Sequence, residues 1–390
     1  MIDFDFVSPT KIFFGKQKEE KVGEAAKEFG FKKVLIVYGS HRIETNGLLT
    51  TVTAHLKENG INFCLLGGVR PNPLIAKVRE GISLAKQEGV DSLLAIGGGS
   101  TIDTCKAIAA GYFYEGDAFD FNLHKATPKK ALPIGVILTF ASAGSELSNS
   151  CVIQDDERCI KQGFNSDLVR PKFAIMNPEL TYGVPNYQKA AGISDIIMHS
   201  LERYCVESEG YTLSDEWALD LIKKVIENGK TMIENPSDYQ SHATIMLCGS
   251  LSHNGLTHLG KRFQFTVHPI EHGLSGYKPD ITHGAGVALL YPAWAMHVVR
   301  EDPERFAYFA KRVFNISLDD KLETAIIGIR QMKEFFSSIG MPTTFREVGL
   351  TKKDIPALVN LISGNGTRVI GCYPQSLNKQ DLEEIFLSLC

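Results

Sequence analysis

The sequence predicts an α/β domain with a parallel sheet over residues 1–180, followed by an all-α domain over residues 181–390. Three observations lead to this prediction. At 390 residues the chain is longer than one ordinary domain of about 150 residues. Strand and helix patterns alternate through the first half, and strand patterns nearly vanish after residues 177–185. No internal repeat, low-complexity tract or flexible linker interrupts either half.

The strands of the first half are short apolar runs that end at glycines or turns. Amphipathic segments that end at glycine lie between them and predict helices. The expected strands are 32–39, 61–69, 91–100 and 132–140, and the expected helices are 47–60, 73–89 and 101–112. Apolar, β-branched strands that alternate with helices are typical of a parallel sheet covered on both faces.

The second half shows helical periodicity instead of strand patterns. The expected helices are 186–208, 212–234, 238–257, 284–300, 302–315, 318–339, 351–363 and 379–389. This pattern predicts a separate helical domain.

The bulk composition excludes several classes of protein. The net charge is −4 and no long basic run occurs, so neither nucleic acid nor an anionic membrane is an expected partner. No apolar stretch approaches the ~20 residues of a membrane span. The first residues carry acids where a signal peptide carries bases, and the eight cysteines form no C-x-x-C pair. We therefore expect a cytoplasmic protein with reduced thiols.

The strand run at 91–100 ends in a glycine loop that leads into the next helix, and this loop predicts a phosphate site. The loop is Gly97-Gly98-Gly99-Ser100, followed by Asp103 and Lys106. Glycines let backbone N–H groups approach a phosphate, and the helix N-terminus favours an anion. The alternative is a tight turn without a ligand, capped by Ser100 or Thr101.

The end of the first clear strand bears on the choice of nucleotide. Its residues Gly39, Ser40, His41 and Arg42 follow Tyr38, and no acid is among them. An acid in this place binds the ribose 2′-hydroxyl of NAD, whereas small and basic residues accept the 2′-phosphate of NADP. The turn therefore favours NADP over NAD, and the alternative is an ordinary exposed arginine.

Two clusters in the helical half indicate a metal site. Asp195 and His199 are four residues apart and share a helical face, as do His268 and His272, with His283 following. A carboxylate with imidazoles suits Fe²⁺ or Zn²⁺ and suits Mg²⁺ or Ca²⁺ poorly. Spacing alone does not decide which histidine is left out.

Taken together, these segments resemble the iron-containing (group III) alcohol dehydrogenases, and most of all their butanol dehydrogenase branch. The resemblance covers nearly the whole chain. It rests on FVSPTKIFFG, similar to the family's N-terminal hairpin, and on GGGSTIDTCKAIA, LTFASAGSE, RPKFAIMNPELT, AGISDIIMHSLERY, HPIEHGLS and THGAGVALLYPAW. It implies a Rossmann-like domain followed by a helical metal-binding domain, the fold shared with dehydroquinate synthase.

The resemblance also implies roles for individual residues. The metal ligands would be Asp195, His199, His268 and His283, and His272 would line the active site as a proton relay. Beside Gly97, Asp103, His41 and Arg42, the expected cofactor-binding residues are Gly39, Ser40, Asn72, Gly98, Gly99, Ser100, Thr139, Ser142, Ser148, Val152 and Lys161.

Several positions depart from the family's pattern. The turn YGSHR stands for the family's YGGGS, and Ala143 stands where a threonine is frequent. Pro269 follows His268 directly, and the loop before His283 is one residue longer, with Lys278 and Pro279 in it. His258 lies where relatives carry small or apolar residues.

The expected function is hydride transfer between NAD(P)(H) and a small primary alcohol/aldehyde pair, with Fe²⁺ or Zn²⁺ as Lewis acid and a homodimer as the assembly. One alternative is a relative similar to glycerol dehydrogenase or dehydroquinate synthase. Another is a non-catalytic protein that binds NAD(P) and metal. The sequence marks no obvious charge that would anchor a substrate.

Overall fold

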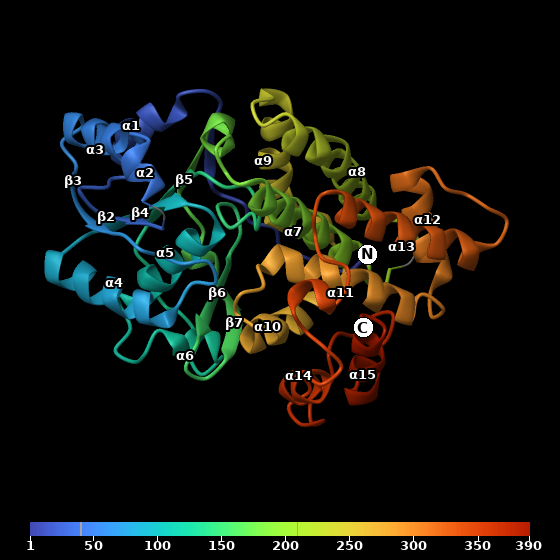
Figure 1. Cartoon of the computed structure of the whole chain (residues 1–390). Helices are drawn as coiled ribbons and strands as arrows, with labels where there is room; N and C mark the ends of the chain where they lie inside the picture. The colour runs from blue at the N-terminus through green and yellow to red at the C-terminus, as the bar shows by residue number, and fades with distance from the viewer. Residues whose placement is uncertain (40, 209) are drawn as a thin grey trace. The chain divides into compact units, whose positions relative to one another are not determined.

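The computed structural model describes residues 1–39, 41–208 and 210–390 (Figure 1). The expected cofactor contact of Ser40 therefore lies outside the described residues. Contacts divide the chain into two compact units, Val7–Gly183 and Val184–Cys390, and the second unit includes Met1–Phe6. The domain boundary at residues 180 and 181 stays a prediction.

The first unit is built on a six-stranded sheet in the order β1-β8-β5-β4-β2-β3. Every neighbouring pair in it is parallel. The strands are β1 Lys11–Phe14, β2 Lys33–Tyr38, β3 Asn62–Leu66, β4 Ser92–Gly97, β5 Ile134–Leu138 and β8 Phe173–Met176. The inner strands β2, β4, β5 and β8 are almost wholly buried, as their continuous apolar sequences predict.

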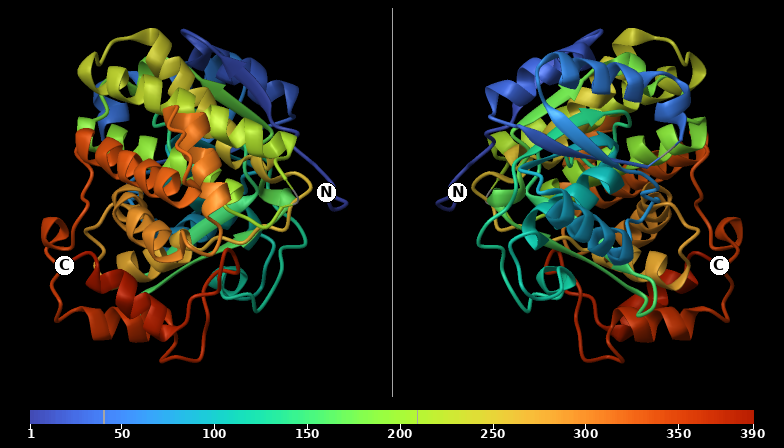
Figure 2. Two further views of the ribbon diagram at one scale, coloured as in Figure 1. Left: turned by 90° about the vertical axis from the view of Figure 1, so that its right-hand side faces the viewer. Right: turned by 90° about the vertical axis from the view of Figure 1, so that its left-hand side faces the viewer.

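Helices cover both faces of this sheet (Figures 1 and 2). Helices α1 and α3 share one apolar core with alternate side chains of β2, β4, β5 and β8. Helix α5 packs with β4, and α4 packs on α5. The helices are α1 Val22–Glu28, α2 Arg42–Thr45, α3 Leu48–Glu58, α4 Ile75–Glu88, α5 Gly99–Gly111 and α6 Phe119–Asn122.

Two strand features differ from the expectation. The segment FVSPTKIFFG forms no hairpin, because its one strand β1 pairs in parallel with β8 at the sheet edge. A hairpin occurs instead at β6 Ser150–Asp155 and β7 Ile160–Asn165, which pair antiparallel as a separate sheet. The charged turn between Asp155 and Ile160, with Cys159 at φ 54°, reverses the chain there.

The second unit is helical, as predicted, and its described residues contain no strand. Its helices are α7 Asn186–Tyr204, α8 Leu213–Glu234, α9 Tyr239–His253, α10 Val267–Tyr277, α11 His283–Val298, α12 Pro303–Phe314, α13 Lys321–Ser338, α14 Ile355–Ile362 and α15 Lys379–Leu387. Helix α7 is buried along nearly its whole length and packs against α8, α9 and α11. A helix with this position presents its polar side chains to the interior, where they need partners.

The N-terminal segment belongs to the second unit. The N–H of Ile2 donates to the carbonyl of Gly260 at 3.0 Å, and a Cβ on Gly260 would lie 2.3 Å from Met1 Cγ. The arm therefore packs closely on the loop that follows α9.

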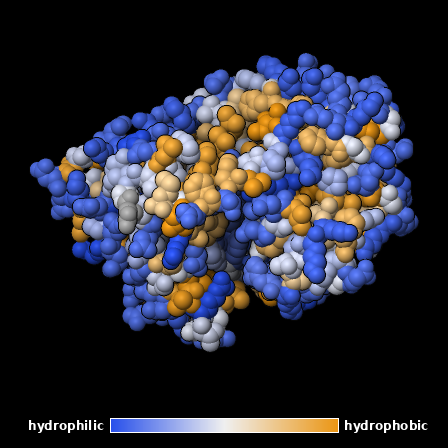
Figure 3. Space-filling model, turned by 180° about the vertical axis from the view of Figure 1, so that it is seen from behind, coloured by the Kyte–Doolittle hydropathy of each residue, from blue (hydrophilic) through white to orange (hydrophobic). Residues whose placement is uncertain are grey.

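None of the helices in the described ranges is long and apolar enough to cross a membrane. The face of the molecule in Figure 3 mixes polar and apolar residues, with many hydrophilic side chains at the surface.

Candidate metal centre and cofactor site

Helix α7 carries three acidic or imidazole side chains on one face. Asp195, His199 and Glu202 follow one another at intervals of four and three residues, so one buried stripe of the helix holds all three. Each is at most 4% exposed. A buried carboxylate that lacks a compensating charge is costly, so this stripe requires a cation or donors.

The other two candidate ligands stand at the beginnings of helices. His268 is the second residue of α10, and His283 is the first residue of α11. Pro269 is the third residue of α10 and lies in its first turn, where a backbone N–H would have no partner within the helix. The longer loop closes with a turn in which Ile281 N–H donates to the carbonyl of Lys278 at 3.1 Å.

Four atoms converge on one point. Asp195 Oδ1 lies 3.6 Å from His199 Nε2, 3.7 Å from His268 Nε2 and 3.6 Å from His283 Nε2. Metal–nitrogen bonds of about 2.0–2.1 Å in a tetrahedron place ligand atoms about 3.3–3.4 Å apart. Side chains of Asp195, His199 and His268 lie as closely as the ligands of one ion would. The arrangement fits a divalent cation.

The electrostatics agree with a cation at this point. Burial alone would raise the pKa of the Asp195 carboxyl, but His199, His283 and His268 hold it well below its ordinary value. Burial lowers the pKa of His199 far below its usual range, which keeps that imidazole neutral and able to ligate. Asp195 is thus an anion among imidazoles, a set of groups that suits a borderline divalent ion such as Fe²⁺ or Zn²⁺.

A glutamate that the sequence reasoning missed lies directly behind His268. Glu202 contacts His268 Nδ1 at hydrogen-bond distance, and its Oε1 accepts the N–H groups of Thr266 at 2.6 Å and Val267 at 2.7 Å. Burial would lower the pKa of His268, but Glu202 and Asp195 raise it to about 9, so a metal ion at Nε2 would take the place of a proton. A carboxylate on Nδ1 sets the ring tautomer and leaves Nε2 for the metal.

Glu271 stands in the same relation to His283. It is fully buried, contacts His283 Nδ1 through Oε2 and accepts from Ser275 Oγ through Oε1. Gly286 makes room for it, since a Cβ there would lie 2.7 Å from Glu271 Cγ. The helical spacing to Asp195 and His268 was the signal that could have found both glutamates.

His272 lies beside the four converging atoms. Its ring centroid is 5.6 Å from that of His283, and it is half-buried. Its ligand atom also lies near those of Glu271 and His283. The three Nε2 atoms around Asp195 Oδ1 belong to the other histidines, so His272 lies at the margin of the site.

In the first unit, the expected nucleotide residues gather where the parallel strands end. The strands β2, β4 and β5 are neighbours in the sheet, so Gly39, Gly97 and Thr139 lie together at the carboxyl ends of these strands. Thr139 N–H donates to Gly97 O at 3.1 Å. A Cβ on Gly39 would lie 3.5 Å from Thr101 Oγ1. In open parallel sheets, ligands bind at the carboxyl ends of the strands.

The glycine loop packs closely against its neighbours. A Cβ on Gly97 would lie 2.4 Å from Thr101 Oγ1, and one on Gly98 would lie 2.8 Å from Phe140. Helix α5 has 13 residues and begins at Gly99, so the partial positive charge of its N-terminus lies at this loop.

Asp103 and Lys106 hold the neighbouring loop. Asp103 accepts from Ser145 Oγ at 2.6 Å and from Val152 N–H at 2.9 Å. Lys106 is fully buried and donates to Ser145 Oγ at 2.8 Å and to both oxygens of Ser148. These contacts hold Ser145, Ser148 and the start of β6 against helix α5.

The remaining expected cofactor residues occupy the loops and the hairpin of the same unit. Ser100 is the second residue of α5, Asn72 has φ 54° in the loop before α4, Ser142 follows Thr139, Val152 lies in β6, and Lys161 lies opposite Gln154 in β7.

The turn after β2 contains an acid that the sequence reasoning overlooked. Glu44 accepts a hydrogen bond from Tyr38 OH at 2.7 Å and lies 3.0 Å from His41 Nδ1. Tyr38 and His41 lower the pKa of Glu44, so it stays a carboxylate. Arg42 begins α2 and lies against Gly183. No acid stands among residues 39–42, but α2 brings Glu44 back to Tyr38, the last residue of β2.

Known proteins resemble the chain along its full length. A family model described as iron-containing alcohol dehydrogenase matches residues 9–178, and one for the C-terminal part of that family matches residues 189–390. NADH-dependent butanol dehydrogenase A of Clostridium acetobutylicum is 41% identical over 99% of both chains. NADPH-dependent aldehyde reductase YqhD of Escherichia coli is 30% identical over 95% of both. The crystal structure of NADH-dependent butanol dehydrogenase A from Thermotoga maritima superposes with a TM-score of 0.94 at 34% identity, covering 100% of this chain and 99% of the other.

The parallel-sheet unit with its glycine loop and the helical unit in which three imidazoles converge on a carboxylate are the arrangement expected of a metal-dependent, nicotinamide-linked oxidoreductase. The chain belongs to the iron-containing alcohol dehydrogenase family. The expected family, the two-part fold and the assignment as an alcohol/aldehyde oxidoreductase are thereby confirmed.

Proposed function

We propose that the protein interconverts a small primary alcohol and its aldehyde with NADH, using Fe²⁺ held by Asp195, His199, His268 and His283. The observation that carries this proposal is the convergence of three Nε2 atoms within 3.6–3.7 Å of Asp195 Oδ1. Gly97, Gly98, Gly99 and Ser100, with the other residues of that sheet edge, support binding of the cofactor.

When bound, the ion supplies Lewis acidity to the substrate oxygen and the nicotinamide exchanges the hydride. The chain's own groups prepare the site. Glu202 and Glu271 hold the Nδ1 atoms of His268 and His283, so both rings keep Nε2 directed toward Asp195. His272, half-buried beside His283, is the group we assign to passing the alcohol proton to solvent.

The preference for NADH over NADPH rests on Glu44. A carboxylate at this strand end pairs with a ribose 2′-hydroxyl and repels a 2′-phosphate. The butanol dehydrogenase relatives from Clostridium and Thermotoga carry NADH in their names, whereas the aldehyde reductase YqhD carries NADPH. This reverses the preference for NADP that the turn suggested when Glu44 was not considered.

The test is a spectrophotometric assay at 340 nm on metal-stripped protein to which Fe²⁺ or Zn²⁺ is restored. We expect turnover of C2–C6 aldehydes with NADH only after metal is restored, and none for Asp195→Ala under either metal. Full activity of the stripped protein would contradict the metal assignment. Binding of cofactor and metal without turnover of any alcohol or aldehyde would favour the non-catalytic alternative.

We also propose a homodimer in the cytoplasm. The sheet leaves β1 and β3 as edge strands, and Ile12 and Leu65 on them are 37% and 42% exposed. Exposed apolar strand edges favour association with a second copy. Sedimentation analysis distinguishes the dimer from a monomer of 43.0 kDa.

A further inference from the structure

A buried arginine lies next to the proposed metal centre in the second unit. Arg203, near the end of α7, is 4% exposed. Its Nη1 donates to the carbonyl of His199 at 2.7 Å, its Nε donates to His258 Nδ1 at 3.3 Å, and its Nη2 lies 3.1 Å from His253 Nδ1. A guanidinium has five N–H groups, and these contacts use three of them.

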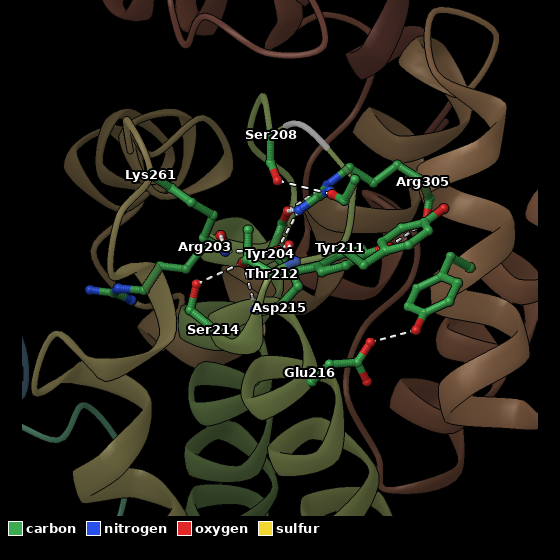
Figure 4. Close-up of polar contacts among 12 residues, drawn as sticks. Arg203, Tyr204, Ser208, Tyr211, Thr212, Ser214, Asp215, Glu216, Lys261 and Arg305 are labelled. Carbon is green, nitrogen blue, oxygen red and sulfur yellow. Dashed lines mark hydrogen bonds and ion pairs between the residues drawn. The ribbon is translucent and has the colours of Figure 1, made fainter. Parts of the chain in front are cut away.

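The carboxylates in this region are committed to other groups. Asp215 accepts from Lys261 Nζ at 2.8 Å and also pairs with Arg305. Figure 4 shows the Arg203 side chain extending away from Asp215. Glu202, the next residue in α7, is occupied by backbone N–H groups and by His268.

Arg203 is therefore a buried cation that no carboxylate contacts directly, although Glu202 and Asp195 act on it through space. Within the described ranges no carboxylate oxygen forms an ion pair with its guanidinium. The C-terminal carbonyls of α7 favour a cation and account for the contact with His199 O, but not for the contacts with the two histidines. A buried charge normally has a partner of opposite sign in direct contact, and the described residues supply none to the two remaining N–H groups of Arg203.

The cluster borders the metal ligands. The Arg203 guanidinium carbon lies 4.8 Å from the ring centroid of Phe263 and 4.9 Å from that of Phe265. The centroid of Phe265 is 4.3 Å from that of His268, and the centroid of His253 is 4.1 Å from that of His199. One layer of aromatic rings thus separates the guanidinium from the ligands.

The two histidines extend the donor set of the arginine. An arginine can only donate, so both imidazoles accept at Nδ1 and carry their proton on Nε2. Burial, with Arg203 and Lys261, lowers the pKa of His258 to about 3, so its Nε2 remains a neutral donor near neutral pH. Both rings are only half-buried and are the accessible members of the cluster.

We propose that Arg203, His253 and His258 form an anion-binding subsite, and that the substrate is a short aldehyde or alcohol with a carboxylate at its far end. This inference rests on the proposed function, since it assigns the substrate class of the same site. A guanidinium fork matches the two oxygens of a carboxylate, and the aromatic rings suit the methylenes between the two ends.

The experiment compares kcat/KM of the metal-loaded enzyme with NADH for 4-oxobutanoate and for butanal, its neutral counterpart of equal chain length. We expect the carboxylate substrate to be preferred by about tenfold or more, the effect of a hydrogen bond to a charged group. An optimum along the series from three to six carbons then reports the distance from subsite to metal. Equal kcat/KM for the two substrates overturns the inference while the proposed function stands.

The variants are His258→Phe and Arg203→Gln. His258→Phe retains an aromatic ring against Phe263 and removes the donor, so it keeps the proposal testable if Arg203→Gln fails to fold. We expect the ratio of the two kcat/KM values to fall toward one in His258→Phe and to be retained in His297→Gln, a partly buried histidine paired with Asp381. A ratio that His258→Phe leaves unchanged overturns the inference.

A binding measurement separates this inference from the proposed function. Calorimetry on the metal-loaded enzyme should show binding of 4-hydroxybutanoate that weakens in His258→Phe, whether or not any aldehyde is turned over. Absence of turnover with this binding intact would refute the proposed function alone. Inorganic phosphate that binds more tightly than 4-hydroxybutanoate would refute the assignment to a carboxylate substrate.

Discussion

Replacing Glu202 with Gln tests how the protein holds its metal. The side-chain carbonyl of Gln can still accept the N–H groups of Thr266 and Val267, which Glu202 Oε1 accepts at 2.6 and 2.7 Å. The amide NH₂ then faces His268 Nδ1, where a carboxylate oxygen stood. A donor at this place favours the tautomer with its proton on Nε2, which is the atom required for the metal.

The expected cost is a 10- to 100-fold loss of metal affinity, the usual effect of removing a hydrogen-bond partner of a ligand histidine. This corresponds to about 1.4–2.8 kcal/mol. Because the shape and the backbone contacts of the side chain survive, we expect the folding stability to change less than the metal affinity.

The assay is competition for Zn²⁺ between the protein and a chromophoric chelator, with the Co²⁺ absorption spectrum as a second readout of ligand geometry. Glu334→Gln is the matched control, since Glu334 is exposed on α13 and pairs only with Gln331 among the described residues. A folded Glu202→Gln protein with the metal affinity and spectrum of the wild type would refute the role assigned to this glutamate.

Three further outcomes are expected. Glu44→Gln should shift the ratio of kcat/KM toward NADPH by about tenfold, since it removes a charge from the 2′ position, and an unchanged ratio would contradict that placement. Gly99→Val should raise the Kd of NADH by about tenfold or more, as measured by fluorescence titration. A Cβ at this position would lie 3.2 Å from Ala143, and the two methyl groups of valine would occupy the space expected for the phosphate. A Kd equal to that of the wild type would argue against a phosphate at this loop. Burial, with Lys189, lowers the pKa of His242 to about 4, below its unfolded value of about 6.5. The unfolded chain therefore binds the proton first, and stability is lost as the pH falls from 6.5 toward 4, by about 2 kcal/mol at pH 5. Urea denaturation at pH 7.5 and pH 5 should show this loss reduced in His242→Gln, and an equal loss in both proteins would show that His242 is not its source.

The sequence could predict those parts of the site that depend on regular spacing. Asp195 and His199 share a face of their helix however the rest of the chain is packed. The glycine loop follows a strand that is recognisable from the strand's own apolar residues. The resemblance then assigned His268 and His283, which lie at two helix beginnings that only the folded chain brings together.

What the sequence could not predict depends on tertiary burial. Glutamate and arginine are usually exposed, so the helical spacing of Glu202 and Glu271 from the ligands did not by itself mark them as interior residues, and nothing local marked Arg203. Glu44 was missed for a different reason, because the short helix α2 folds it back toward a strand end that it follows by six residues. The hairpin of β6 and β7 was also missed, and one of its tertiary contacts is the hydrogen bond from Val152 N–H to Asp103.

Glu202 contacts both a proposed metal ligand and the backbone at the start of α10. The same carboxylate that contacts the His268 ring also accepts the first N–H groups of α10, so it acts as a helix cap supplied by a different helix. Occupancy of the metal site and order at the beginning of α10 are therefore thermodynamically linked, and each must favour the other to the same degree. The hydrogen-exchange rates of the Thr266 and Val267 amides should therefore fall as the metal site is filled, and they can be measured without any substrate.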